Sequence, residues 1–134
     1  MLNCWCLMSN HLHLIASAAN KDLSGVLRDF KKFTAKQLIR AIENNPGERR
    51  KEWMLPIFRA KGLGNSRNAE NQFWKQDNHP EELYNGYFTY QKLNYIHDNP
   101  VKARIVRNSW EYLYSSARDY HETRKCGQLD ITFI

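Results

Sequence analysis

Two histidines, His11 and His13, flank one apolar residue at the end of the apolar run Cys4–Met8. Successive side chains of a β-strand point to opposite faces, so in a strand both imidazoles share one face, about 7 Å apart, while Leu12 enters the core. This spacing lets both rings bind one divalent metal ion. Histidines on a half-exposed strand also commonly hydrogen-bond to water or neighbouring groups, and that alternative stays open.

A second group of reactive side chains lies near the other end of the chain, in the sequence YIHDNP that starts at Tyr95. If this segment is helical up to Asn99, Tyr95 and Asn99 lie one turn apart on one face. His97 points to another side, and we assign it to structure. A histidine pair with a helical tyrosine and a polar neighbour indicates metal-assisted attack of tyrosine on a phosphodiester. Core packing of the tyrosine and a helix C-cap at Asn99 are the alternatives.

Four segments resemble sequence boxes of one transposase family and occur in the same order. Residues 8–15 (MSNHLHLI) resemble the MPNHVHL box of the single-tyrosine HUH transposases. Residues 95–103 (YIHDNPVKA) resemble the YIHxNPVKAG box of their REP-associated branch. Residues 73–81 resemble the intervening FWQxxxHP segment, and residues 112–120 resemble the SSA-containing stretch that follows. From about Leu2 to about Tyr120, the chain is therefore similar to the REP-associated tyrosine transposases.

The resemblance implies that Tyr95 attacks a phosphate of single-stranded DNA, which gives a 5′-phosphotyrosyl link and a free 3′-OH. It also implies Mg²⁺ or Mn²⁺ on His11 and His13, with a third ligand one turn after the tyrosine, where this chain has Asn99. An amide oxygen is a hard ligand, and imidazole suits Mn²⁺ better than Mg²⁺. The implied substrate is a single strand near a hairpin of the REP type.

Basic residues that flank the boxes are candidates for contacts with the DNA backbone, because phosphate contacts tolerate imprecise placement. The candidates are Lys61, Arg67, Lys75, Lys102, Arg104 and Arg107. The net charge of +6 favours a polyanionic partner, and aromatic rings near basic residues can stack on unpaired bases. A further basic set forms either a solvated helix face or a DNA contact: Arg28, Lys31, Lys32, Lys36 and Arg40.

The fold implied by the resemblance is α+β and ferredoxin-like, with an antiparallel sheet and helices packed on one face. Members of the family carry a first strand and a first helix before the histidine box, whereas Met1 lies close to His11 here. We therefore expect one N-terminally incomplete domain over residues 1–120 and a C-terminal tail over 121–134. Without the first strand, the histidine strand has an unpaired edge, so we expect a monomer or a homodimer joined at that edge.

Hydrophobic patterning predicts the elements around the boxes. Residues 4–16 read as one strand, apolar on both faces and central in the sheet. The other expected elements are a helix from 21 to about 44, a second helix over 48–60 kinked or split at Pro56, a basic loop over 61–70, a short strand over 72–76 and the tyrosine helix over 88–99. Pro100 should end the tyrosine helix, because the residue before a proline disfavours helical geometry.

Composition narrows the class of protein. A chain of 134 residues can bury one core. Three cysteines, an odd number, argue against a disulfide framework and fit a reducing cytoplasm, and Cys4 and Cys6 do not have the usual spacing of zinc ligands. No run approaches the roughly 18 apolar residues of a membrane span, and no signal peptide is evident. We expect a cytoplasmic, nucleoid-associated protein with no membrane partner.

Three functions of different classes fit these observations. The leading one is DNA nicking and strand transfer by Tyr95. The second is a non-catalytic nucleic-acid-binding remnant of such a transposase. The third is a metal-dependent phosphodiesterase in which the histidine pair activates water. The presence of Tyr95 with His11 and His13 favours the first over the second, and the helical spacing of Tyr95 and Asn99 favours it over the third.

Overall fold

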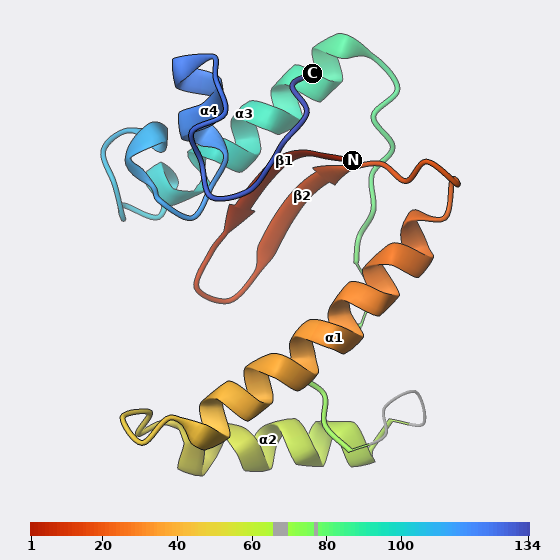
Figure 1. Ribbon diagram of the computed structural model, residues 1–134, viewed down its shortest axis with the longest axis vertical. Coiled ribbons are helices and arrows are strands. Elements are labelled where there is room, and N and C mark those ends of the chain that lie inside the picture. Colours follow the sequence, from red (N-terminus) through yellow and green to blue (C-terminus); the bar gives the residue numbers. More distant parts are fainter. Residues whose placement is uncertain (66–69, 77) are drawn as a thin grey trace. The chain divides into compact units, whose positions relative to one another are not determined.

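The computed structural model describes residues 1–65, 70–76 and 78–134, and its architecture is α+β, as expected (Figure 1). The elements are, in chain order, β1 (Leu2–Leu7), β2 (Leu12–Ala16), α1 (Leu23–Asn44), α2 (Lys51–Leu63), α3 (Gly86–Lys102), the 3-10 helix η1 (Ser109–Glu111) and α4 (Ala117–Glu122). Their contacts form two compact units: unit 1 holds residues 1–23 and 81–134, and unit 2 holds residues 24–80. Within the described ranges, no helix is both long and apolar enough to cross a lipid bilayer.

The strand expected over residues 4–16 is instead an antiparallel hairpin of β1 and β2, so that prediction is wrong. The Met8 amide donates to the His11 carbonyl at 2.9 Å and closes the turn between the strands. Ser9 and Asn10 account for the turn, because their short polar side chains favour turn backbones even within an apolar stretch.

The strand of unit 1 that has backbone hydrogen bonds on both edges is β1, and not the histidine strand β2. On its other edge, the Leu7 amide donates to the Tyr114 carbonyl at 2.8 Å, and the Ser116 amide donates to the Trp5 carbonyl at 3.0 Å. In the described part of the chain, β2 pairs with β1 alone. The predicted central position of the histidine strand is therefore wrong, because residues 114–116 return to β1 and not to β2.

α3 packs on β1 and carries the predicted tyrosine (Figure 1). The hairpin and α3 share one buried cluster, which consists of Cys4, Cys6, Met8, Ile15, Leu93 and Ile96. At the start of α3, Asn85 is the N-cap, and its Oδ1 accepts a hydrogen bond from the Phe88 amide at 2.8 Å. The burial of Leu93 and Ile96 sets the rotation of α3, so that Tyr95 lies outside the core.

α3 continues through Pro100 to Lys102, so the predicted end at Asn99 is wrong. A proline inside a helix leaves the carbonyl four residues earlier without its usual N–H partner. That carbonyl belongs to Ile96, and the Asn99 Nδ2 lies 3.4 Å from it while donating to the Tyr95 carbonyl at 2.8 Å. Pro100 is buried, and its packing together with the Asn99 amide offsets the local cost of the missing bond.

The C-terminal residues pack on unit 1. Asp119 of α4 is fully buried, and its Oδ1 accepts two backbone N–H groups, those of Cys126 and Gly127, both at 2.7 Å. Further on, the Thr132 amide donates to the Leu2 carbonyl at 2.9 Å. This bond attaches the segment predicted as a tail to β1, while the predicted single domain over residues 1–120 stays a prediction.

Unit 2 consists of α1, α2 and the segment 70–76. α1 ends at Asn44, as predicted, and α2 is not split at Pro56. The strand predicted over residues 72–76 is absent from this described segment. The aromatic rings of this segment contact the helices instead. The Trp74 Nε1 donates to the Thr34 Oγ1 at 2.8 Å, and the centroid of the Phe73 ring lies 5.2 Å from that of Phe58.

Candidate functional site

The two histidines predicted as metal ligands lie side by side in unit 1. His13 is the second residue of β2, and His11 ends the turn that precedes this strand. Their ring centroids are 4.8 Å apart, with an angle of 87° between the ring planes. The two imidazoles therefore lie on the same side of the hairpin, close enough for one ion to contact both.

Asn10 orients the His11 ring. The His11 Nδ1 lies 2.6 Å from the Asn10 Oδ1, which can only accept a hydrogen bond, so Nδ1 carries the proton. In the neutral ring the lone pair of His11 is then on Nε2. An imidazole that donates one N–H to an oxygen and offers the other nitrogen is the usual arrangement of a metal-binding histidine.

The His13 ring has an orphaned nitrogen. Its Nε2 is buried and has no hydrogen-bond partner among the residues that the structure describes. Burial, and next to it the proximity of His11, lowers the pKa of His13 below its ordinary value, which favours the neutral ring. A buried, neutral and unpartnered imidazole nitrogen is what a metal ligand requires, because the metal supplies the missing partner.

Tyr95 of α3 lies next to this pair. Its ring centroid is 5.8 Å from that of His13, with an angle of 82° between the planes, and 49% of the residue is exposed. The Lys102 Nζ lies 4.8 Å from the centre of the tyrosine ring, and the Lys92 Nζ lies 6.0 Å from it. Both ammonium groups place positive charge beside the phenol ring, which favours anions there. His11, His13 and Tyr95 are called the His–Tyr site below.

Asn99, the predicted third ligand, lies on α3 one turn after Tyr95 and is half buried. Its Nδ2 bonds to carbonyls of its own helix, which leaves Oδ1, on the other side of the amide, as the atom that can bind a ligand. The alternative role as C-cap is wrong, since Ala103 occupies that position.

A buried hydrogen-bond network holds α3 against β1. The His97 Nε2 lies 3.2 Å from the Cys4 Sγ and 2.9 Å from the Ser116 Oγ. Burial lowers the pKa of His97 to about 4 and raises the pKa of Cys4 to about 12. Both groups are therefore neutral near pH 7, which excludes a thiolate–imidazolium nucleophile here. The network positions Tyr95, two residues from His97, which agrees with the structural role expected for His97.

The two histidines of the His–Tyr site could hold a manganese or magnesium ion only together with a ligand that is not a His, Cys, Asp or Glu side chain. Among the described residues, no group of three or more His, Cys, Asp and Glu side chains could hold a metal ion. Two imidazole nitrogens and one amide oxygen would bind a divalent ion weakly, and Mn²⁺ better than Mg²⁺.

Three of the predicted DNA contacts follow Tyr95 in unit 1. Lys102 lies over the tyrosine ring. Arg104 follows the C-cap of α3 with a left-handed φ of 57°, a position where helices commonly have glycine. The Arg107 amide donates to the Glu111 carboxylate at 3.1 Å. These three residues are in the same compact unit as the His–Tyr site.

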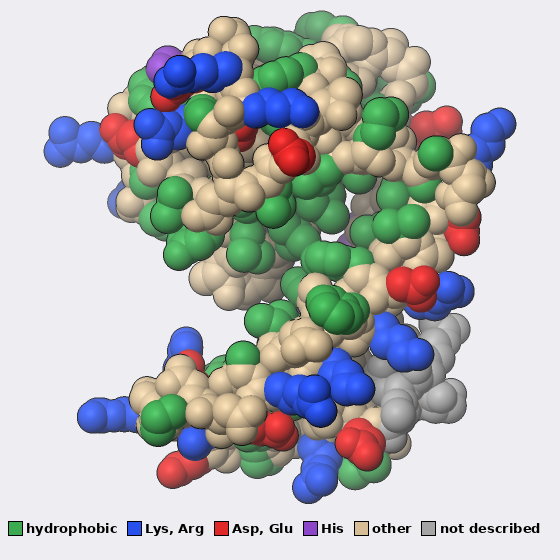
Figure 2. All heavy atoms as spheres, in the orientation of Figure 1, with side chains coloured by type: hydrophobic (Ala, Val, Ile, Leu, Met, Phe, Trp, Pro, Cys, Tyr) green, Lys and Arg blue, Asp and Glu red, His purple; other side chains and the backbone are tan. Residues whose placement is uncertain are grey.

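The other predicted DNA contacts belong to unit 2 or lie outside the described residues. Lys61 is in the last turn of α2, and Arg67 falls outside the described residues. Lys75 lines a groove of about 1090 Å³ between α1 and residues 70–76. Five basic side chains of α1 line the same groove: Arg28, Lys31, Lys32, Lys36 and Arg40. Figure 2 shows lysine and arginine side chains over this helix.

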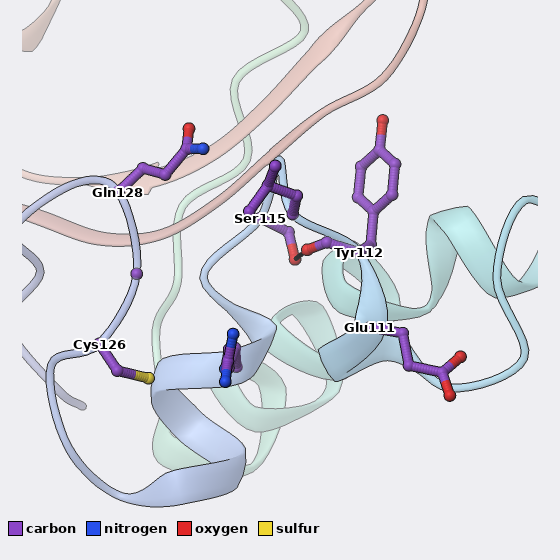
Figure 3. A pocket seen from close by; sticks show the side chains of 8 residues that line it. Glu111, Tyr112, Ser115, Cys126 and Gln128 are labelled. Carbon is purple, nitrogen blue, oxygen red and sulfur yellow. Dashed lines mark hydrogen bonds between the residues drawn. The ribbon is translucent and has the colours of Figure 1, made fainter.

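A smaller pocket of about 130 Å³ in unit 1 contains none of the predicted site residues (Figure 3). η1, α4 and the segment 126–128 line it, with Glu111, Ser115 and Cys126 among the contributors. It is therefore separate from the His–Tyr site.

The sequence analysis missed two residues of the site, Asn10 and Lys92. Lys92 lies three residues before Tyr95, and Lys102 seven residues after it, which is the spacing of one helix face. That spacing is a signal in the sequence. Asn10 has the residue type of an ordinary turn residue, but it matches the asparagine of the MPNHVHL box.

Comparisons of the chain with models of protein families, with curated proteins and with solved structures give no match. The function is therefore argued from the geometry of the His–Tyr site and from the four sequence boxes.

Proposed function

We propose that this protein nicks single-stranded DNA and transfers the strand through a covalent intermediate on Tyr95. The observation that carries the proposal is the convergence of three rings from two separate parts of the sequence. His11 and His13 lie 4.8 Å apart, and Tyr95 lies 5.8 Å from His13. The four sequence boxes that resemble the REP-associated tyrosine transposases support the same function.

A divalent ion, Mg²⁺ or Mn²⁺, fits the two histidines. The His11 Nε2, the orphaned His13 Nε2 and the Asn99 Oδ1 would hold it. When bound, such an ion neutralises charge on the phosphate and orients it for in-line attack.

The chemical step is carried by Tyr95. Its phenol oxygen forms a bond to phosphorus, the bond from phosphorus to the 3′-oxygen breaks, and the phenol proton passes through solvent to that oxygen. The products are a 5′-phosphotyrosyl link and a free 3′-OH. Attack of another 3′-OH on this link reverses the step and joins strands. Lys102, 4.8 Å from the ring, holds the phosphate beside the nucleophile.

The finer features of the proposal come from the resemblance. They are a ferredoxin-like arrangement within the α+β architecture, REP-type hairpin DNA as substrate and a cytoplasmic, nucleoid-associated location. The outer edge of β2, which pairs with nothing in the described residues, is the surface through which a homodimer would form.

Formation of a protein–DNA adduct tests the proposal. The full chain is incubated with Mn²⁺ and a labelled single-stranded oligonucleotide that carries a hairpin, and is then run on a denaturing gel. We expect a labelled protein band that Tyr95→Phe and His13→Ala both abolish. Tyr87→Phe is the matched control, since Tyr87 is an exposed tyrosine on the same helix and should not affect the band.

Other outcomes would contradict the proposal and identify its competitors. DNA cleavage that persists in Tyr95→Phe would indicate a phosphodiesterase that uses water. Tight DNA binding without an adduct or cleavage by the unaltered chain would indicate a non-catalytic nucleic-acid-binding protein.

A further inference from the structure

A row of aromatic and cationic side chains begins at Tyr84, just before α3, and continues along one face of α3 to the His–Tyr site. We call Tyr84, Phe88, Lys92, Tyr95 and Lys102 the α3 ladder. Positions 88, 92, 95 and 102 lie on one side of a helix by their spacing of three, four and seven residues. The buried residues Leu93, Ile96 and His97 occupy another side of the helix, whereas Phe88 and Lys92 are partly exposed and Tyr95 is exposed.

Successive members of the ladder contact one another. The Tyr84 and Phe88 rings are stacked, with centroids 4.8 Å apart and an angle of 17° between planes. The Lys92 Nζ lies 5.2 Å from the Phe88 ring and 6.0 Å from the Tyr95 ring, and the Lys102 Nζ lies 4.8 Å from the latter. The row therefore has no gap between the outermost ring and the proposed nucleophile.

The outer end of the ladder is an open aromatic face. Tyr84 is 73% exposed although one side of its ring is covered by Phe88. Burial of an aromatic ring stabilises a protein, so a stacked pair left this open is suited to receive a third flat group. Lys92 is partly neutralised by Glu81, 2.6 Å away, so the ladder becomes more positive toward Lys102 and the His–Tyr site.

We propose that the α3 ladder is a stacking platform that positions the single strand next to the phosphate attacked by Tyr95. An unpaired base stacks on the open face of Tyr84, and Lys102 contacts the backbone. This inference rests on the proposed function, because it assigns a substrate path to the same site. Aromatic rings interleaved with cations are the usual means of binding unpaired bases, and a duplex does not expose its base faces. Phe88 and Tyr95, seven residues apart, are separated by about 10 Å along the helix.

Binding of oligonucleotides to the Tyr95→Phe chain tests the platform without covalent chemistry. Fluorescence anisotropy is measured with a hairpin-bearing single strand and with a series in which one base at a time is replaced by an abasic site. We expect Tyr84→Ala to weaken binding about tenfold, which is within the range measured for stacking of one base. In the Tyr95→Phe chain, the parent of the variants below, an abasic site at one position should weaken binding by a similar factor. The same abasic site should have no effect once Tyr84→Ala is added.

Two further variants make the test specific. Tyr84→Trp keeps a stacking face and should bind like the parent. Tyr90→Ala removes a ring that is 64% exposed on another side of α3 and should also bind like the parent. Equal affinities of Tyr84→Ala and Tyr90→Ala, or a loss in Tyr84→Ala that leaves the abasic profile unchanged, would overturn the platform.

The two proposals fail in different ways. If the unaltered chain forms the Tyr95 adduct while Tyr84→Ala forms it at the same rate and binds DNA equally well, only the platform is wrong. If the abasic profile depends on Tyr84 but no adduct forms, the platform stands as a binding surface and the nicking function is wrong.

Discussion

Acidification should destabilise unit 1 through one buried group, His97. This imidazole is buried between α3, β1 and α4, where it bonds to Cys4 and Ser116. Burial lowers its pKa from 6.5 to about 4, although the nearby carboxylates Asp98 and Asp119 act in the opposite direction. The Tyr120 ring packs beside it, 5.3 Å away.

The direction of the pH dependence follows from which state, the folded or the unfolded, binds the His97 proton more readily. Unfolded, the His97 ring takes up a proton below its ordinary pKa of 6.5, whereas the folded protein resists protonation until about pH 4. The stability that neutral His97 supports is therefore complete above pH 6.5, decreases as the pH falls, and levels off below about pH 4. The difference between these two pKa values corresponds to a loss of about 3 kcal/mol in the free energy of unfolding between pH 6.5 and pH 4.

Hydrogen exchange of the β1 amides in increasing urea measures this stability for unit 1 alone. The control is His97→Gln, which keeps hydrogen-bonding groups but does not titrate. His13, whose pKa is also lowered, contributes with the same sign in both proteins, so the difference between them isolates His97. The unaltered chain should lose stability more steeply than the variant between pH 6.5 and pH 5. If the stability of the two proteins depended on pH in the same way, this role of His97 would be refuted.

Changes at three other places in the chain have expected outcomes. Gly62→Ala should lower the stability of unit 2 by roughly 1–3 kcal/mol, because its Cβ would clash with the backbone carbonyl of Glu70, whereas the Cβ of Gly64→Ala meets nothing closer than 3.6 Å. Thermal unfolding of the two variants tests this difference. Arg104→Gly should raise stability by about 1 kcal/mol in urea unfolding, by relieving the left-handed φ of 57°. Lys36→Glu together with Arg40→Glu should weaken the binding of all single strands alike. In anisotropy titrations, the slope of the logarithm of the binding constant against the logarithm of salt concentration should decrease in magnitude by about two.

Much of the arrangement could be predicted because it depends on local spacing. The His-x-His pattern predicted two neighbouring rings, although only His13 lies in the strand and His11 belongs to the turn before it. The helical pattern around Tyr95 predicted a tyrosine on a helix, and its ring contacts that of His13. The end of α1 at Asn44 followed from the Asn-Pro-Gly sequence after it. The α+β class is confirmed, while the roles of these residues remain predictions.

The failures have tertiary causes. Pro100 stays inside α3 because burial and the Asn99 amide compensate for its missing N–H, and neither is visible in the sequence. The segment around Trp74 has the apolar pattern of a strand, but its indole N–H bonds to Thr34 on α1, and its rings pack on the helices. The pairing of Cys4 with His97 joins residues distant in the sequence, so no local pattern could reveal it.

Peptide mass spectrometry after reaction with DNA tests the central claim most directly. The full chain is incubated with Mn²⁺ and a hairpin-bearing single strand, the DNA is trimmed with nuclease, and the protein is digested. The account predicts a peptide whose Tyr95 carries a 5′-phosphonucleotide, and no such peptide when His11 and His13 are both changed to alanine. A nucleotide on another residue, such as Tyr87 or Tyr90, or no modified peptide at all, would contradict it.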